Sequence, residues 1–122
     1  MLDHMVVLAS DLDVSRRFYL QALAPLGYGV LLEYPGVVGF GVDPKPDFWV
    51  REGPAHDRVH VAFASPDRAT VDAFHAAAVA AGGRDNGPPG VREIYHPSYY
   101  GAFVHDPDGH NIEAVCHEPF LG

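Results

Sequence analysis

The amino-acid sequence repeats itself, and this internal similarity constrains the fold more than any single motif does. At an offset of 56 residues, the segment DHMVVLAS near the start of the chain lies over VHVAFAS in its middle. The same offset aligns pairs of identical residues: His4 with His60, Asp11 with Asp67, Phe18 with Phe74, and Gly27 with Gly83. A repeat of this kind indicates one supersecondary unit that occurs twice.

The two copies share the same order of sequence patterns for secondary structure. A short apolar run is followed by an aspartate that can cap a helix, then by apolar residues at helical spacing, and then by glycine. The spacing predicts one helix over residues 14–24 and a second over residues 67–81. Their core-facing residues are expected to be Phe18, Ala22 and Leu23 in the first, and Val71, Phe74, Ala77 and Ala78 in the second.

Strand patterns follow each helix and are separated by proline- and glycine-rich turns. In the first copy they cover residues 29–33, 37–42 and 48–51, and in the second they cover 92–95, 100–105 and 111–116, after a loop at 86–90. Each copy therefore reads as a βαβββ module. We expect an α+β fold in which one domain, residues 1–122, contains two such modules at about 1–54 and 55–122, because neither half is large enough to bury a good core alone.

Charge and hydropathy exclude several classes of function. Sixteen acidic and eight basic residues give a formal charge of −8, which disfavours nucleic acid or an anionic membrane surface as a partner. The sequence has no run of 18 apolar residues and no basic-then-apolar start, so we expect neither a transmembrane span nor a secretory signal, and a cytoplasmic location. The single cysteine, Cys116, lies in an apolar pattern and is expected to be a buried, unreactive thiol.

The segment VHDPDGHNIEAV, residues 104–115, contains a charged residue in an unexpected place. Its Asp-Pro-Asp-Gly turn predicts a β-hairpin whose second strand puts Asn111, Glu113 and Val115 on one face. If that face is wet, Glu113 is simply solvated. If it faces a core, the carboxylate must be neutralised, hydrogen-bonded or bound to a cation.

The repeat offers a cation site for this carboxylate. His4 and His60 occupy the same position of the same strand in the two copies, so pairing of the copies about a pseudo-twofold axis would bring the imidazoles together. Two imidazoles and the carboxylate of Glu113 would suit a divalent metal. We therefore predict that His4, His60 and Glu113 are metal ligands.

These features resemble the vicinal oxygen chelate superfamily, which includes glyoxalase I, extradiol dioxygenases, fosfomycin-resistance transferases and bleomycin-resistance proteins. The resemblance is carried by the paired modules, by HMVVLASDLDVSRRFY and RVHVAFASPDRATVDAF, and by AFVHDPDGHNIEAV near the end. It implies a glyoxalase/bleomycin-resistance/dioxygenase-like fold, and it places metal ligands at His4, His60 and Glu113.

Glyoxalase-like members usually add a fourth protein ligand from the last strand of the first module. Alignment of the two Asp-Pro turns puts Val50 opposite Glu113, and a one-residue change puts Trp49 there; neither side chain binds a metal. Glu52 is the alternative. A three-ligand site with open positions is the main expectation, and Fe, Mn, Ni, Co and Zn would all accept it.

The segment REIYHPSYYGAF, residues 92–103, is expected to overhang the metal. His96, Tyr99 and Tyr100 are predicted catalytic residues that transfer protons or orient a bound oxygen, and Trp49 and Tyr95 are predicted to line the substrate pocket. The alternative is that the tyrosines pack at a dimer interface. The other histidines, His56, His75, His105, His110 and His117, are expected at the surface.

Two functions follow from the resemblance. The first is a metal-dependent dioxygenase, or a lyase or isomerase, in which a small oxygen-rich substrate chelates the metal and the metal acts as a Lewis acid. The second is a metal-free protein of the bleomycin-resistance type that sequesters a small molecule among its aromatic side chains. Both imply a homodimer, formed side by side or by exchange of modules.

Overall fold

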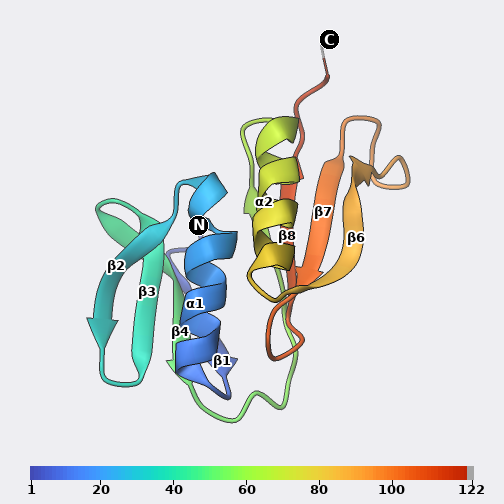
Figure 1. Ribbon diagram of the computed structural model, residues 1–122. Coiled ribbons are helices and arrows are strands. Elements are labelled where there is room, and N and C mark those ends of the chain that lie inside the picture. The colour runs from blue at the N-terminus through green and yellow to red at the C-terminus, as the bar shows by residue number, and fades with distance from the viewer. Residues whose placement is uncertain (121–122) are drawn as a thin grey trace.

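The computed structural model describes residues 1–120 and contains two four-stranded sheets, each with one α-helix (Figure 1). The first half contains β1 (Met5–Ala9), α1 (Leu12–Ala22), a short 3₁₀ helix η1 (Ala24–Leu26), β2 (Gly29–Tyr34), β3 (Val37–Val42) and β4 (Lys45–Glu52). The strand order of this sheet is β1-β4-β3-β2, with β1 parallel to β4 and the other pairs antiparallel.

The second half repeats the plan with β5 (His60–Ala64), α2 (Arg68–Ala80), β6 (Arg84–Val91), β7 (Tyr100–His105) and β8 (Asn111–Cys116). Its order, β5-β8-β7-β6, matches the first sheet strand for strand, and β5 is again parallel to β8. The predicted α+β fold of paired βαβββ modules is confirmed.

Each helix begins directly after an aspartate that caps it; α1 starts and ends two residues before its predicted bounds of 14–24, and α2 lies within one residue of its predicted bounds of 67–81. The Asp11 carboxylate accepts a hydrogen bond from Val14 N at 3.2 Å, and the Asp67 carboxylate accepts one from Thr70 N at 2.7 Å. Each cap satisfies a backbone donor that the first helical turn leaves free. Neither α1 nor α2, the α-helices of the described residues, combines the length and the apolar character needed to cross a membrane.

The prediction of a strand at residues 92–95 is wrong, because these residues form turns and the strand lies earlier, at Arg84–Val91. The prolines and glycines at 87–90 are typical of a loop, so the sequence pattern does not indicate this strand. These residues are tolerated because β6 is an edge strand, and its register shifts at Gly87 and Gly90. Proline lacks a backbone donor and is therefore confined to such edges or to bulges.

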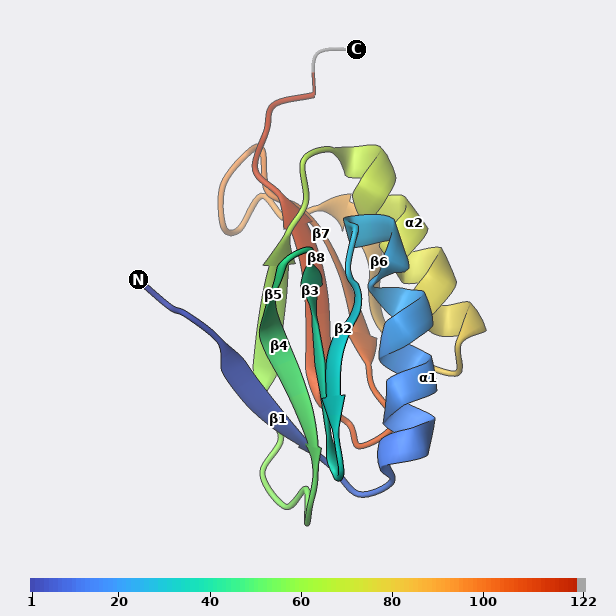
Figure 2. The same cartoon turned by 90° about the vertical axis from the view of Figure 1, so that its left-hand side faces the viewer.

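The two halves share one hydrophobic core. Phe48 of β4 meets Phe63 of β5 with ring centroids 5.2 Å apart, and Tyr28 meets Phe63 at 5.3 Å. Both helices lie on the same side of the sheets, and no helix of residues 1–120 covers the opposite side, which we call the open face (Figure 2). Side chains that alternate with the core residues therefore point to the open face, where a site can form.

Candidate functional site on the open face of the second sheet

Glu113 is the residue on which the candidate site is built. It lies on β8 between Ile112 and Ala114, which belong to the hydrophobic core, so its own side chain points the other way, to the open face. Even so, only 1% of Glu113 is exposed. Of the two alternatives that the sequence leaves open, a solvated or a buried carboxylate, the structure has the buried one, and the carboxylate needs partners.

Two side chains supply them. His60 Nε2 on β5 lies 2.8 Å from Glu113 Oε1, and the Tyr99 hydroxyl donates a hydrogen bond to Oε2. Gly101 leaves the space for this arrangement, since a Cβ there would lie 3.2 Å from Oε2 and 3.1 Å from the Tyr99 ring. Both carboxylate oxygens are therefore occupied, each by a different element of the fold.

Tyr99 serves as a hydrogen-bond donor because it keeps its proton. Burial, followed by the hydrogen bond to Glu113, raises the pKa of Tyr99 well above its usual value. The hydroxyl therefore remains protonated at neutral pH. Of the three predicted catalytic residues, Tyr99 is the one that contacts the carboxylate.

His96 lies behind Tyr99. Its ring centroid is 5.5 Å from that of Tyr99, and its Nε2 is 2.8 Å from Nδ1 of His117. Tyr95 packs on Tyr99 with centroids 4.8 Å apart, although 63% of Tyr95 is exposed. The sequence predicts that His117 is solvated. Instead it lies beside His96 of the loop between β6 and β7, and no local sequence pattern indicates this contact.

Tyr100 does not belong to the site. Its hydroxyl donates to Asp72 Oδ1 on α2 at 2.6 Å, and Arg68 lies over its ring at 4.9 Å. The side chain of Tyr100 is therefore on the helix side of β7, opposite to Glu113. The alternation of a strand explains the correction, because adjacent residues such as Tyr100 and Gly101 face opposite sides.

Sequence reasoning missed two residues near the site, Phe103 opposite Glu113 and Arg92 over the Phe103 ring. Phe103 pairs with Glu113 across β7 and β8, and its ring centroid is 6.1 Å from that of His60. The Arg92 guanidinium lies 5.5 Å from the centre of the Phe103 ring. The parity of β7 could have identified Phe103; Arg92 comes from a loop that the sequence assigned to a strand.

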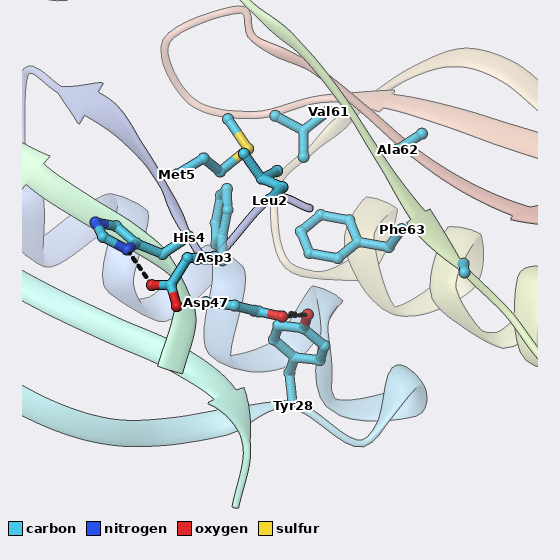
Figure 3. Close-up of a pocket in the computed structure, with 11 residues that line it drawn as sticks. Leu2, Asp3, His4, Met5, Tyr28, Asp47, Val61, Ala62 and Phe63 are labelled. Atoms are coloured by element: carbon cyan, nitrogen blue, oxygen red, sulfur yellow. Dashed lines mark hydrogen bonds and ion pairs between the residues drawn. The ribbon is translucent and has the colours of Figure 1, made fainter. Parts of the chain in front are cut away.

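His4 directly precedes β1 of the first sheet and does not join His60 and Glu113 within one chain. Its Nδ1 is 2.6 Å from Asp3 Oδ1, and it lines a pocket of about 250 Å³ between β1 and β5 (Figure 3). Among residues 1–120, no group of three or more His, Cys, Asp or Glu side chains is arranged to hold a metal ion. One chain thus brings together two of the three predicted ligands.

The strand register identifies the counterpart of Glu113 in the first half. Val6 pairs with Trp49, and its twin Ala62 pairs with Glu113, so Trp49 and not Val50 occupies the equivalent position. The Trp49 ring stacks on Tyr34 at 6.3 Å between centroids. Val50 is fully buried in the core, and Glu52 is exposed at the end of β4.

One of the predicted surface histidines is in fact buried. His110 is 1% exposed; its Nδ1 accepts a hydrogen bond from Val59 N at 3.1 Å, and its Nε2 donates to Leu8 O at 2.9 Å. The prediction was wrong because the turn before β8 is covered by both halves. His105 is partly exposed, and Cys116 is buried as expected.

Comparisons with known proteins agree with this architecture. Residues 1–114 match the model of the Glyoxalase/Bleomycin resistance protein/Dioxygenase superfamily. A glyoxalase/bleomycin resistance protein from Albidiferax ferrireducens T118 is 32% identical, with a TM-score of 0.82 over 96% of this chain and 98% of the other. No curated protein sequence matches the chain.

More distant solved structures share the fold. A glyoxalase/bleomycin resistance protein/dioxygenase family enzyme from Burkholderia phytofirmans PsJN is 17% identical, with a TM-score of 0.75 over 96% of this chain and 98% of that one. The fosfomycin resistance protein FosX from Mesorhizobium loti is 20% identical, with a TM-score of 0.71 over 99% and 93% of the two chains. At these identities the likeness concerns the fold alone.

Proposed function

Because the chain belongs to the Glyoxalase/Bleomycin resistance protein/Dioxygenase superfamily, we propose that it is a metal-dependent enzyme acting on a small, oxygen-rich molecule. The observation that carries this proposal is the buried carboxylate of Glu113, whose Oε1 lies 2.8 Å from the imidazole nitrogen of His60. A dioxygenase and a lyase or isomerase are the reaction classes that the proposal includes.

The donor set fits a divalent metal. Carboxylate oxygen and imidazole nitrogen are both common metal ligands. His60 Nε2 and Glu113 Oε1 lie 2.8 Å apart, close enough for both atoms to contact one ion. His60 and Glu113 would therefore hold the ion, for which iron, manganese, nickel, cobalt and zinc are all suitable.

The third ligand in the proposal is His4 of a second copy of the chain. His4 is the twin of His60 in the repeat, and 52% of its side chain is exposed, so it is free to meet another subunit. Its own chain places it away from Glu113. The proposed protein is accordingly a homodimer in which each site takes ligands from both chains.

When bound, the metal would act as a Lewis acid that stabilises a developing oxyanion on the substrate. The chain's own residues hold the carboxylate in place and exclude water from it. The Tyr99 hydroxyl donates a hydrogen bond to Glu113 Oε2, and such outer hydrogen bonds orient a ligating carboxylate. Phe103 and the Arg92 guanidinium cover the neighbouring part of the open face.

A metal-free sequestration protein is the second candidate. One observation favours it: Trp49 stands where the second half has Glu113, and it stacks on the 57%-exposed Tyr34. Flat aromatic surfaces on an open face suit capture of a planar ligand. In this function Trp49 and Tyr95 would line the binding groove.

Metal content separates the two candidates. Protein purified without chelators should carry about one divalent ion per chain, measured by elemental analysis. His60→Ala and Glu113→Gln should each lose it, and His56→Ala, which removes an exposed loop histidine, should keep it. A native protein without metal would overturn the enzyme proposal and leave sequestration in its place.

Subunit mixing tests the shared site. If His4 comes from the partner, a heterodimer of one His4→Ala chain and one His60→Ala chain contains one intact site, although each homodimer contains none. We expect the mixture to recover metal in about a quarter of all sites when exchange is random. Recovery of no metal in a verified heterodimer would contradict a site that spans two chains.

A further inference from the structure

The segment of residues 92–99, which we call the Tyr99 loop, connects β6 to β7 and ends on Tyr99. Its backbone closes on itself, because Arg92 N donates to Tyr99 O at 2.7 Å and Tyr99 N donates to His96 O at 3.1 Å. The side-chain hydrogen bond that ties this loop to the C-terminal segment joins His96 to His117.

The two imidazoles are held in a defined arrangement. His96 Nδ1 accepts a hydrogen bond from Ser98 N at 3.0 Å, which leaves the proton of a neutral ring on Nε2. This Nε2 lies 2.8 Å from His117 Nδ1, so His96 donates and His117 accepts. The rings also stack, with centroids 5.1 Å apart and an interplanar angle of 29°.

This arrangement requires both rings to be neutral. A proton added to His117 Nδ1 would face the N–H of His96, and one added to His96 Nδ1 would face the N–H of Ser98. In either case a ring nitrogen that accepts a hydrogen bond becomes a donor, and it then faces another N–H donor. Histidine is the side chain whose unperturbed charge changes between about pH 5 and 8.

The surroundings do not supply a compensating charge. The groups that face the pair are the Tyr99 ring, 5.5 Å from the centre of His96 and 5.2 Å from that of His117, and Tyr95 beyond it. Glu113 lies on the far side of the Tyr99 hydroxyl, and Glu118 follows His117 in the chain. Within residues 1–120, neither histidine of the pair has a carboxylate oxygen within 4 Å.

We propose that His96 and His117 are positioning residues: the neutral pair holds the Tyr99 loop so that Tyr99 donates to Glu113, and protonation of the pair releases the tyrosine. The inference rests on the proposed function only in taking Glu113 as the functional carboxylate. In this proposal His117, which directly follows β8, controls the hydrogen bond that Tyr99 donates to Glu113.

The test observes Tyr99 directly. In protein with ¹³C-labelled tyrosine, assigned with Tyr99→Phe, the Tyr99 ring signal should shift as the pH falls from 8 to 5. His117→Ala at pH 8 should give the signal that the wild type gives at pH 5. In His117→Asn, whose side-chain oxygen can still accept from His96, the Tyr99 signal at pH 8 should keep the position that it has in the wild type at pH 8.

Two control variants test whether the shift of the Tyr99 signal depends on the His96–His117 pair and not on another histidine. His56→Ala removes an exposed histidine elsewhere and should titrate like the wild type. His60→Ala removes the other histidine near Glu113, and the Tyr99 transition should persist in it. A wild-type Tyr99 signal that does not move between pH 8 and 5, or one unaffected by His117→Ala, would overturn the inference.

This readout needs no metal, so it is independent of the proposed function. Where metal is bound, His117→Ala should weaken metal affinity about tenfold at pH 8, the lower end of the effect of lost outer-shell partners, while His117→Asn should not. Unchanged affinity in His117→Ala would contradict the positioning role. A metal-free protein with a pH-dependent Tyr99 would overturn the enzyme proposal and support this inference.

Discussion

At the scale of single residues, the buried carboxylate of Asp106 shows how the hairpin before β8 is held. It accepts hydrogen bonds from Asp108 N at 2.9 Å and His110 N at 2.8 Å, which shape the turn. Its other oxygen accepts from the hydroxyl of Tyr19 on α1 at 2.5 Å. Tyr19 is fully buried and Asp106 is 6% exposed, so this bond joins the first helix to the turn of the second half in a largely dry environment.

Tyr19→Phe should destabilise the protein by about 1.5–3 kcal/mol, the range for a lost hydrogen bond to a charged group. The ring and its packing remain, and Asp106 loses one of three donors. Urea unfolding followed by circular dichroism measures the change. Tyr34→Phe is the matched control, because Tyr34 is 57% exposed, and it should change stability by less than about 0.5 kcal/mol.

Tyr19→Phe should also change how the stability of the protein depends on pH in the alkaline range. Burial, followed by the charge of Asp106, raises the pKa of Tyr19 well above its usual value. A group whose pKa is raised by folding contributes stability below its unfolded pKa, about 10 for tyrosine, and this contribution is lost as the pH rises above that value. We expect wild-type stability to fall above pH 10 more steeply than that of Tyr19→Phe; equal slopes would contradict this account.

At the scale of elements, the segment after α2 is closely packed against both α1 and β7. A Cβ added to Gly83 would lie 2.5 Å from Val104 Cγ1, 2.7 Å from Phe18 Cε1 and 2.8 Å from the carbonyl oxygen of Ala78. Glycine therefore lets α2 end directly against both α1 and β7. This explains why glycine stands at this position.

Gly83→Ala should cost about 1–3 kcal/mol, the usual range for overpacking a core, and a thermal unfolding curve should show the loss. Gly29→Ala is its control, since a Cβ at Gly29 would meet no atom within 4 Å. That variant should be neutral or slightly stabilising, because alanine loses less conformational entropy than glycine. Similar losses in both variants would rule out the close contact as the cause.

The elements that the sequence predicts well are those with strong local signals. Asp11 and Asp67 mark the helix starts, and residues 37–42, 100–105 and 111–116 form strands as predicted. The site is harder to predict because its geometry depends on register. The choice between Val50 and Trp49 depends on one residue in a hairpin, and the meeting of His96 with His117 depends on how a loop folds back.

At the scale of the whole molecule, His110 joins the two halves. It lies in the turn before β8, accepts from Val59 at the entry to β5, and donates to the carbonyl of Leu8 on β1. Because one ring nitrogen accepts and the other donates, the neutral Nε2–H form matches both partners. No single-residue pattern could reveal this, since the partners lie 51 and 102 residues away in sequence.

His110→Leu should destabilise the protein by about 1–3 kcal/mol, because it removes the hydrogen bonds to Val59 N and Leu8 O, at about 0.5–1.5 kcal/mol each. Chemical denaturation should show one cooperative transition at lower denaturant. His56→Leu, in the exposed linker, should leave the midpoint nearly unchanged. A His110→Leu protein as stable as the wild type would show that the two halves do not depend on this ring.

The contact between Phe48 and Phe63 makes each half of the chain depend on the other. One ring belongs to each copy of the repeat, so a polypeptide of one half alone would expose its phenylalanine ring to water unless it associated with another copy. The two copies have different residues at equivalent positions, Trp49 in one and Glu113 in the other, yet the shared pair of aromatic rings keeps both in a single core.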